Sequence, residues 1–209
     1  MQRQLADEEE QMKFVRFESG GRTSYGIVEG DKVRALDGTP FGRFERTDRV
    51  TALSSVRLLA PCEPSKIVCL GLNYADHARE TGQKLPETPL VFMKPSTAVQ
   101  HPEGPIVYPA MSSRVDHEAE LAIVIRKAAT AVGEDAWREY VLGYTCLNDV
   151  TARDLQARDG QWTRAKGFDT FCPIGPRVAA GLDPSNLRIT TRVNGVVKQD
   201  SSTSDLIFD

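Results

Sequence analysis

The sequence predicts a mainly β protein with short helices, an α+β arrangement in which a small β unit precedes a larger one. Segments in which apolar and polar residues alternate recur along the chain, separated by turns that contain glycine. They outnumber the helical segments, and none alternates regularly with a long helix, as a doubly wound sheet would require. Pro61 and Pro64 mark the expected boundary between the units. We therefore expect a disordered tail over 1–11, a small N-terminal β domain over 12–60 and a main domain over 61–209.

The first unit is predicted to be a three-stranded meander. Alternating segments lie at 14–18, 23–29 and 32–36, and Ser19-Gly20-Gly21 and Gly30-Asp31 lie between them. Glycine favours the backbone conformations of tight turns, so each pair of segments is expected to form a hairpin.

The main unit is predicted to begin with a short buried strand over 67–70. Asn73 is expected to cap a helix over 74–80, with Gly82 just past its end. The later elements that we expect are a strand over 115–125, short helices over 134–141 and 151–158, an irregular segment over 162–171, and a hairpin over 189–197 with an Asn-Gly turn.

Composition and charge exclude several classes of function. The chain has 209 residues and a formal net charge of -3, so no basic stripe is available to neutralise the phosphates of a nucleic acid. The sequence contains no run of about 18 apolar residues, so we expect no membrane span. The N-terminus lacks the apolar core of a secretory signal. The four cysteines show neither paired spacing nor the density of a disulfide scaffold, so we expect reduced thiols and a cytoplasmic protein.

Three carboxylates, Glu118, Glu120 and Asp149, are the candidate metal ligands. If 118–125 is a strand, Glu118 and Glu120 point to one face roughly 7 Å apart, with nothing basic between them. Ala122 and Val124 continue that face, which favours burial over the alternative of a solvated strand face. Buried ionised carboxylates require a cation or protons. A hard divalent ion, Mg²⁺ or Mn²⁺, is the cation that oxygen ligands suit best.

The three histidines differ in what surrounds them. His77 and Glu80 are three residues apart on the predicted helix and therefore share a face. As a dyad, the carboxylate would orient the imidazole so that it can take a proton from water; the alternative is a simple helix contact. His117 is expected on the strand face opposite the glutamates, in a structural role. His101 lies in a proline-rich loop, with no neighbour that indicates a function.

Five motifs follow one another along the main unit. They are Gly71-Leu72-Asn73-Tyr74 leading to His77 and Glu80, Phe92-Met93-Lys94-Pro95-Ser96, Asp116-His117-Glu118-Ala119-Glu120-Leu121, Gly143-Tyr144-Thr145 through Asp149 to Gln156, and Lys166-Gly167-Phe168-Asp169 through Pro176. This ordered set resembles the fumarylacetoacetate hydrolase family, metal-dependent enzymes that act on β-diketo acids and related 2-oxo acids. The resemblance covers about 66–209 and implies that 61–209 is a catalytic domain with a fumarylacetoacetate-hydrolase-like mixed β-sandwich roll.

The resemblance also implies roles for three residues after Asp149. Lys166 is similar to the family's site lysine, a fixed cation near an oxygen that gains negative charge. Arg153 and Gln156 look like a substrate-contacting pair, and arginine suits a carboxylate. Without the resemblance, Lys166 is interpreted as a solvated charge, and Arg153 as an ion-pair partner of Asp154 or Asp149.

The function implied is a metal-dependent hydrolase that cleaves a C–C bond in a small 2,4-dioxo, acylpyruvate-like acid through a metal-chelated enolate. The same site would serve a 2-hydroxyhepta-2,4-diene-1,7-dioate isomerase or an oxaloacetate decarboxylase. The non-enzyme alternative is a catalytically idle relative that binds a dicarboxylic acid. By resemblance we also expect a homodimer. Members of the family usually continue past the position of Asp209, so the C-terminal part of the catalytic domain is expected to be missing or not covered.

Overall fold

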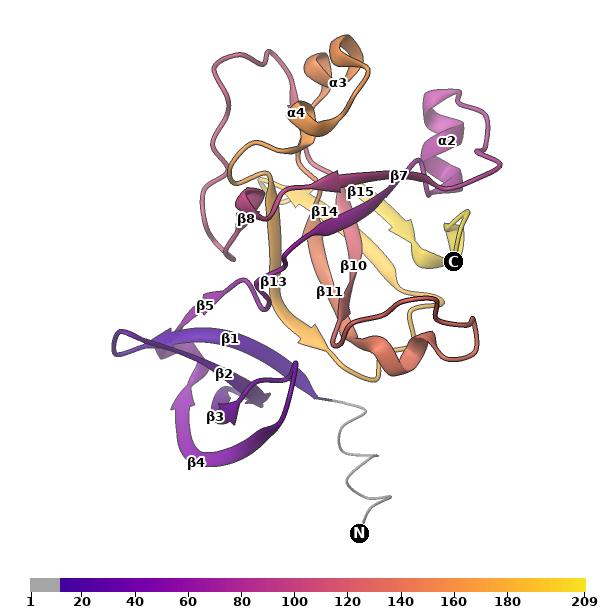
Figure 1. Cartoon of the computed structure of the whole chain (residues 1–209). Helices are drawn as coiled ribbons and strands as arrows, with labels where there is room; N and C mark the ends of the chain where they lie inside the picture. The colour runs from indigo at the N-terminus through magenta and orange to yellow at the C-terminus, as the bar shows by residue number, and fades with distance from the viewer. Residues whose placement is uncertain (1–11) are drawn as a thin grey trace.

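A computed structural model describes residues 12–209 of the chain, and the tail predicted over 1–11 lies outside them. As predicted, the described part is mainly β: one nine-stranded sheet and three two-stranded sheets, with short helices at the periphery (Figure 1). None of the described helices is long and apolar enough to cross a membrane.

The strands are β1 (Lys13–Ser19), β2 (Arg22–Glu29), β3 (Lys32–Gly38), β4 (Phe44–Ala52), β5 (Arg57–Leu59), β6 (Ile67–Gly71), β7 (Leu90–Lys94), β8 (Val99–Gln100), β9 (Val115–Asp116), β10 (Ala119–Ile125), β11 (Val141–Asn148), β12 (Thr151–Ala152), β13 (Cys172–Ala179), β14 (Arg188–Val193) and β15 (Val196–Ser202). The helices are α2 (Ala75–Thr81), α3 (Arg153–Asp159) and α4 (Thr163–Lys166), with 3₁₀ turns η1 (Leu53–Ser55), η2 (Ser96–Ala98), η3 (Trp137–Tyr140) and η4 (Thr203–Asp205).

The predicted meander is confirmed. Strands β1, β2 and β3 pair antiparallel, and Gly20, Gly21 and Gly30 all have positive φ at the two turns. The sequence did not indicate β4, which pairs with β3, because its central residues are polar and exposed on both faces and show no alternation.

The N-terminal strands and the main unit belong to one continuous sheet. Its order is β10-β11-β13-β1-β2-β3-β4, with β1 antiparallel to β13 through Phe14 and Val178. The main core cluster contains residues of both units, among them Phe14, Ile27, Val124 and Val178. The boundary predicted at 60–61 falls between β5 and β6, and the two-domain division stays a prediction.

The strand predicted over 115–125 is interrupted, which corrects the sequence interpretation. Asp116 of β9 pairs with Thr151 of β12, whereas Ala119 of β10 pairs with Asn148 of β11. The chain changes its partner strand between these two positions. His117 and Glu118 therefore belong to no strand.

Helix α2 forms where predicted and ends at Gly82, whose φ is +66°. Asn73 does not cap it, because Tyr74 is the N-cap residue and makes no side-chain capping bond. The Asn73 amide instead donates to the carbonyl oxygen of Phe208 (3.0 Å) and accepts from the Phe208 N–H (2.9 Å). The residue therefore joins the start of α2 to the end of the chain.

Two further element predictions are only partly met. The helix expected over 134–141 is reduced to the 3₁₀ turn η3, and the segment expected to be irregular contains the short helix α4. The hairpin predicted over 189–197 is confirmed as β14 and β15, with positive φ at Asn194 and Gly195, as a tight hairpin turn requires.

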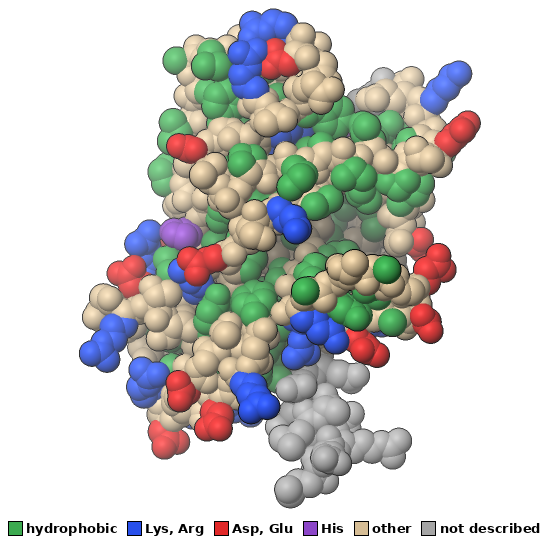
Figure 2. All heavy atoms as spheres, in the orientation of Figure 1, with side chains coloured by type: hydrophobic (Ala, Val, Ile, Leu, Met, Phe, Trp, Pro, Cys, Tyr) green, Lys and Arg blue, Asp and Glu red, His purple; other side chains and the backbone are tan. Residues whose placement is uncertain are grey.

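The outer face of the β6–β7 ribbon is apolar. Val68 lies opposite Met93 and Leu70 opposite Val91, and these side chains are 40–59% exposed. Figure 2 shows apolar side chains across this part of the surface. The alternate residues of the ribbon, including Lys94, face the interior, so the ribbon forms one wall of the cavity described next.

Candidate active site

A cavity of about 720 Å³ lies between the β6–β7 ribbon, α2, the start of β10, α3 and β15. All of the site residues predicted from the sequence line it: His77, Glu80, Glu118, Glu120, Asp149, Arg153, Gln156 and Lys166. They come from distant parts of the chain, and their roles stay predictions. The geometry of their contacts decides which roles each side chain can have.

Lys166 lies between two of the three carboxylates. Its Nζ donates to Glu118 Oε2 and to Asp149 Oδ2, each at 2.6 Å, and its side chain is 3% exposed. Spacing along the strand did not indicate this cation, because α4 places a lysine from 48 positions along the chain beside Glu118. The alternative of a solvated lysine is wrong.

A second lysine, Lys94, contacts Asp149 at its other carboxylate oxygen. Its side chain is fully buried, and its Nζ donates to Asp149 Oδ1 (2.7 Å) and to the carbonyl oxygen of Val150 (3.2 Å). No role for Lys94 was predicted from the sequence. The available signal was its position on β7, two residues after Phe92 and therefore on the same inward face.

Glu120 differs from the other two carboxylates. It accepts no hydrogen bond from any residue within 12–209, and burial, followed by the charges of Glu118 and Asp149, raises its pKa to about 8. Burial would also raise the pKa of Glu118, but the charges of Lys166 and Arg153 outweigh it and the pKa is lowered. Glu120 is thus a carboxyl that holds its proton at neutral pH unless another cation approaches.

Each of the three guanidinium nitrogens of Arg153 donates to a neighbouring side chain. It donates to Glu118, to Asp116 Oδ2 (3.1 Å) and to Gln156 Oε1 (3.0 Å). Asp154 and Asp149, the ion-pair partners considered from the sequence, are not its partners; Asp154 accepts from Ser112 and Ser113 instead. Because Gln156 accepts from Arg153 through its oxygen, its NH₂ group remains available to a ligand.

The predicted dyad residues lie on α2, which also lines the cavity. His77 and Glu80 both line the cavity, and Glu80 is exposed. The His77 backbone N–H donates to Asp76 Oδ1 (2.7 Å), and Asp76 Oδ2 accepts from the Ser201 hydroxyl of β15 (2.6 Å). The helix is therefore tied to β15 next to His77.

The other two histidines, His117 and His101, lie in different surroundings. His117 lines the same cavity as the glutamates, so the expectation that it faces away from them is wrong. The interruption between β9 and β10 removes the strict alternation on which that expectation depended. His101 Nδ1 accepts from the backbone N–H of Ala60 (3.1 Å), a structural link that the sequence did not indicate.

Aromatic rings complete the wall around Lys166. Its Nζ lies 4.9 Å from the Phe92 ring centroid and 6.0 Å from that of Trp162, and the two rings meet edge to face. Gly71 is required beside them, because a Cβ there would lie 2.7 Å from the Trp162 ring. The rings attract the ammonium charge and reduce its contact with water.

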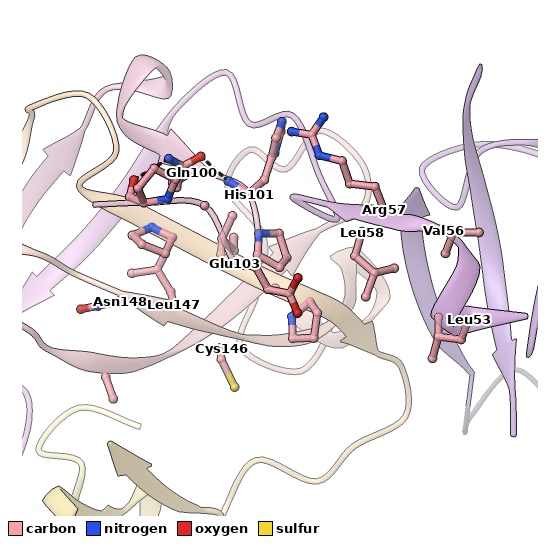
Figure 3. Close-up of a pocket in the computed structure, with 18 of the residues that line it drawn as sticks. Leu53, Val56, Arg57, Leu58, Gln100, His101, Glu103, Cys146, Leu147 and Asn148 are labelled. Atoms are coloured by element: carbon pink, nitrogen blue, oxygen red, sulfur yellow. Dashed lines mark hydrogen bonds between the residues drawn. The ribbon is translucent and has the colours of Figure 1, made fainter. Parts of the chain in front are cut away.

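A second cavity, of about 980 Å³, lies on the other face of β10 (Figure 3). Ala119 lines it, whereas the next residue, Glu120, lines the first cavity, and successive strand residues point to opposite faces. Its wall includes Gln100, whose amide donates to the Pro105 carbonyl oxygen (2.8 Å) and accepts from the His101 N–H (2.9 Å). None of the predicted site residues lines this second cavity.

The donor set of the first cavity fits a divalent cation. Glu118, Glu120 and Asp149 offer carboxylate oxygens, the ligands that Mg²⁺ and Mn²⁺ prefer. Within the described residues no three His, Cys, Asp or Glu side chains already form a set of metal ligands, and Lys166 lies between two of the carboxylates. The observation that fits a cation is Glu120, a half-buried carboxylate with no hydrogen-bond donor in that part of the chain.

Comparison with protein families agrees with the motif order. Residues 66–209 match the model described as fumarylacetoacetate (FAA) hydrolase C-terminal, and residues 12–61 match Rv2993c-like, N-terminal. A Methanocaldococcus jannaschii protein is 56% identical over 147 residues, which cover 70% of this chain and 62% of that protein. Protein Rv2993c of Mycobacterium tuberculosis is 45% identical over 208 residues, covering 95% of this chain and 78% of the relative.

Relatives whose names state an activity are enzymes of different kinds. The rat mitochondrial oxaloacetate tautomerase Fahd2a is 43% identical over 160 residues, covering 74% of this chain and 51% of its own length. The structure of 2-hydroxyhepta-2,4-diene-1,7-dioate isomerase from Mycobacterium marinum has a TM-score of 0.87 at 43% identity, covering 95% of this chain and 77% of that one.

A solved hydrolase gives the same fold. Maleylpyruvate hydrolase from Sphingobium sp. SYK-6, in complex with manganese(II) and pyruvate, has a TM-score of 0.73 at 30% identity and covers 95% of this chain and 79% of that one. The family model matches well over half of the chain, and solved members share its fold. The chain therefore belongs to the fumarylacetoacetate hydrolase family.

Proposed function

We propose that the chain is a divalent-metal-dependent enzyme that cleaves a C–C bond in a small 2,4-dioxo acid of the acylpyruvate type through an enolate. The observation that carries the proposal is the shared cavity, which is lined by three carboxylates, the predicted His-Glu dyad and a buried lysine. The manganese and pyruvate named for the hydrolase relative support both the metal and the substrate class.

Glu118, Glu120 and Asp149 would hold the ion, Mg²⁺ or Mn²⁺, whose chemistry is Lewis-acid stabilisation of the negative charge on a 2-oxo acid as its enolate forms. The protein keeps two of these ligands ionised at fixed positions. Lys166 holds Glu118 and Asp149 together at 2.6 Å from each, and Lys94 holds the second oxygen of Asp149. Glu120, whose pKa is raised to about 8, has to lose a proton when the site is loaded.

The remaining side chains bind the substrate, stabilise negative charge or transfer a proton. The free NH₂ group of Gln156 donates to a substrate oxygen, and Arg153 fixes that orientation by donating to the amide oxygen. Lys166, with one ammonium hydrogen unused by the carboxylates, is placed to stabilise an oxygen that gains charge. His77 takes a proton from water at an imidazole nitrogen, oriented by Glu80, so that the water attacks the distal carbonyl.

A second candidate, isomerisation or keto–enol tautomerisation, is favoured by the names of two relatives, the rat oxaloacetate tautomerase and the M. marinum isomerase. These reactions need proton transfer on the same enolate but no attacking water. Decarboxylation of oxaloacetate would use the enolate in the same way. The non-enzyme alternative would leave His77 and Glu80 without a role.

Substrate screening tests the proposal. Purified protein is assayed with acylpyruvates, oxaloacetate and hydroxydienedioates, each with Mg²⁺, with Mn²⁺ and with EDTA. Metal-dependent cleavage of an acylpyruvate into pyruvate and a second carboxylic acid supports hydrolysis, and metal-dependent release of CO₂ from oxaloacetate supports decarboxylation. Metal-dependent proton exchange without cleavage supports the second candidate. No turnover on any of these acids would leave the idle binding protein as the better interpretation.

The dyad is tested with His77→Ala and with Arg79→Ala, an exposed residue of the same helix that does not line the cavity. We expect His77→Ala to lower kcat for cleavage by about 10²–10⁴-fold while it keeps its Mn²⁺ affinity, because general-base catalysis contributes that much. Arg79→Ala should retain activity. Full hydrolysis by the His77 variant would refute its assignment as the base.

A further inference from the structure

Gln199 of β15 makes a pair of hydrogen bonds with the backbone between the two glutamates. Its Nε2 donates to the carbonyl oxygen of Ala119 (3.0 Å), and its Oε1 accepts from the Ala119 N–H (2.9 Å). Ala119 separates Glu118 from Glu120 and is the first residue of β10. One side-chain amide thus satisfies both backbone groups of the residue that links the two carboxylates.

The position of this contact makes it structurally important. Within the described residues β10 is the last strand of the nine-stranded sheet, so one of its edges has no strand neighbour. At its start the chain has just changed partner from β12 to β11. Unpaired backbone groups at such an edge have no ladder to fix them. The Gln199 amide occupies the place that a neighbouring strand would take.

The same strand, β15, also contacts α2, the helix that carries His77 and Glu80. Gln199 and Ser201 are two residues apart on β15 and therefore point to the same face. The Ser201 hydroxyl donates to Asp76 Oδ2 at 2.6 Å, next to His77. Strand β15 is consequently tied to the carboxylates by Gln199 and to the dyad helix by Ser201.

We propose that Gln199 is a positioning residue: by holding both backbone groups of Ala119, it sets the directions of Glu118 and Glu120 and their placement relative to His77. The proposal rests on the proposed function for its consequence, since the carboxylates thus placed are those that would hold the ion. Residues that orient metal ligands without touching the metal are typically worth 10- to 100-fold in affinity.

The test compares Gln199→Leu with a matched control, Gln100→Leu. Gln100 makes the same kind of amide pair with backbone groups, to Pro105 and His101, but lines the other cavity (Figure 3). Each variant loses two side-chain-to-backbone bonds. Three measurements are made. They are Mn²⁺ affinity, by electron paramagnetic resonance titration of metal-free protein; steady-state kinetics on the best substrate, which give kcat and KM; and the hydrogen-exchange rate of the Ala119 amide.

We expect Gln199→Leu to weaken Mn²⁺ binding by about 10- to 100-fold, to lower kcat and to accelerate exchange at Ala119. Gln100→Leu should change none of the three, even if both variants unfold at the same lower urea concentration. Wild-type Mn²⁺ affinity and kcat in Gln199→Leu would overturn the proposal, as would an equal loss in the control.

Failure of the proposed function gives a different result. Wild-type protein that neither binds Mn²⁺ nor turns over a 2-oxo acid would refute that function. The exchange rate of the Ala119 amide still decides the structural claim, because it needs no metal. Unchanged exchange in Gln199→Leu would then show that Gln199 does not fix this part of the backbone.

Discussion

Replacing Lys94 by methionine tests whether the buried lysine stabilises the cluster. The Lys94 side chain is fully buried, and that of its partner Asp149 is 5% exposed, with 2.7 Å between Nζ and Oδ1. Lys94→Met keeps the length and apolar stem of the side chain but leaves one oxygen of Asp149 without its cation. Breaking such a buried pair costs about 3–5 kcal/mol. Lys166 still neutralises the other oxygen of Asp149, so we expect a loss at the lower end of that range.

The size of the effect is large enough to measure by urea unfolding. With an m-value of about 2 kcal/mol/M, a loss of 3–5 kcal/mol lowers the midpoint by about 2 M. Urea is preferred to guanidinium, whose ions screen charges. The experiment is done at pH 7 in EDTA, and the unfolding curves from tryptophan fluorescence and far-ultraviolet circular dichroism must coincide before a two-state free energy is used.

A double-mutant cycle isolates the pair. Asp149→Asn alone should also destabilise, but Lys94→Met combined with Asp149→Asn should cost less than the sum of the two, with a coupling energy of about 2–3 kcal/mol. As a control, Arg188→Met breaks the exposed pair with Asp200 and should cost less than about 1 kcal/mol. A Lys94 variant within about 1 kcal/mol of wild type, or strict additivity in the cycle, would show that this pair does not stabilise the fold.

Three further outcomes follow from the same geometry. Glu118→Ala should greatly weaken Mg²⁺ binding, and calorimetric titration with unchanged affinity would remove it from the ligand set. The pKa of Glu120 is raised from 4.5 unfolded to about 8 folded, so the stability of metal-free protein should fall by up to about 5 kcal/mol as pH rises between these values. Glu120→Gln should flatten that dependence in urea unfolding with EDTA, whereas the exposed control Glu87→Gln should keep it. Gly71→Ala places a Cβ 2.7 Å from the Trp162 ring and should lower the unfolding midpoint and change tryptophan emission; an unchanged spectrum and midpoint would contradict the close contact.

Local sequence signals predicted the elements that form through local contacts. The meander β1–β3 and the hairpin β14–β15 follow from alternation and from glycine or Asn-Gly turns, which act over a few residues. The pairing of β1 with β13 joins residues about 165 positions apart, and nothing local specifies its register. The partner change at His117 has the same origin, because two different strands compete for one continuous segment.

The sequence predicted which residues line the candidate site better than it predicted the contacts between them. Motif order placed the carboxylates, His77 and Lys166 in one site, and the structure puts them in one cavity. It did not reveal that Lys166 lies between two carboxylates, because that contact depends on where α4 packs. Lys94 was missed for a different reason: a lysine at a strand end is ordinarily solvated, and only the inward direction of its side chain distinguishes it.

A buried carboxylate needs a cation or a proton, and the three carboxylates of the cavity meet this need in different ways. Asp149 and Glu118 receive their positive charges from lysine and arginine side chains of the protein itself. Glu120 has no such partner within residues 12–209, and its raised pKa is the consequence. Sequence spacing treats Glu118 and Glu120 as equivalent, but their surroundings lower the pKa of Glu118 and raise that of Glu120. We propose that Glu120 exchanges its proton for a metal ion. A pH dependence of Mn²⁺ affinity that disappears in Glu120→Gln and persists in Glu87→Gln would assign that exchange to Glu120 alone.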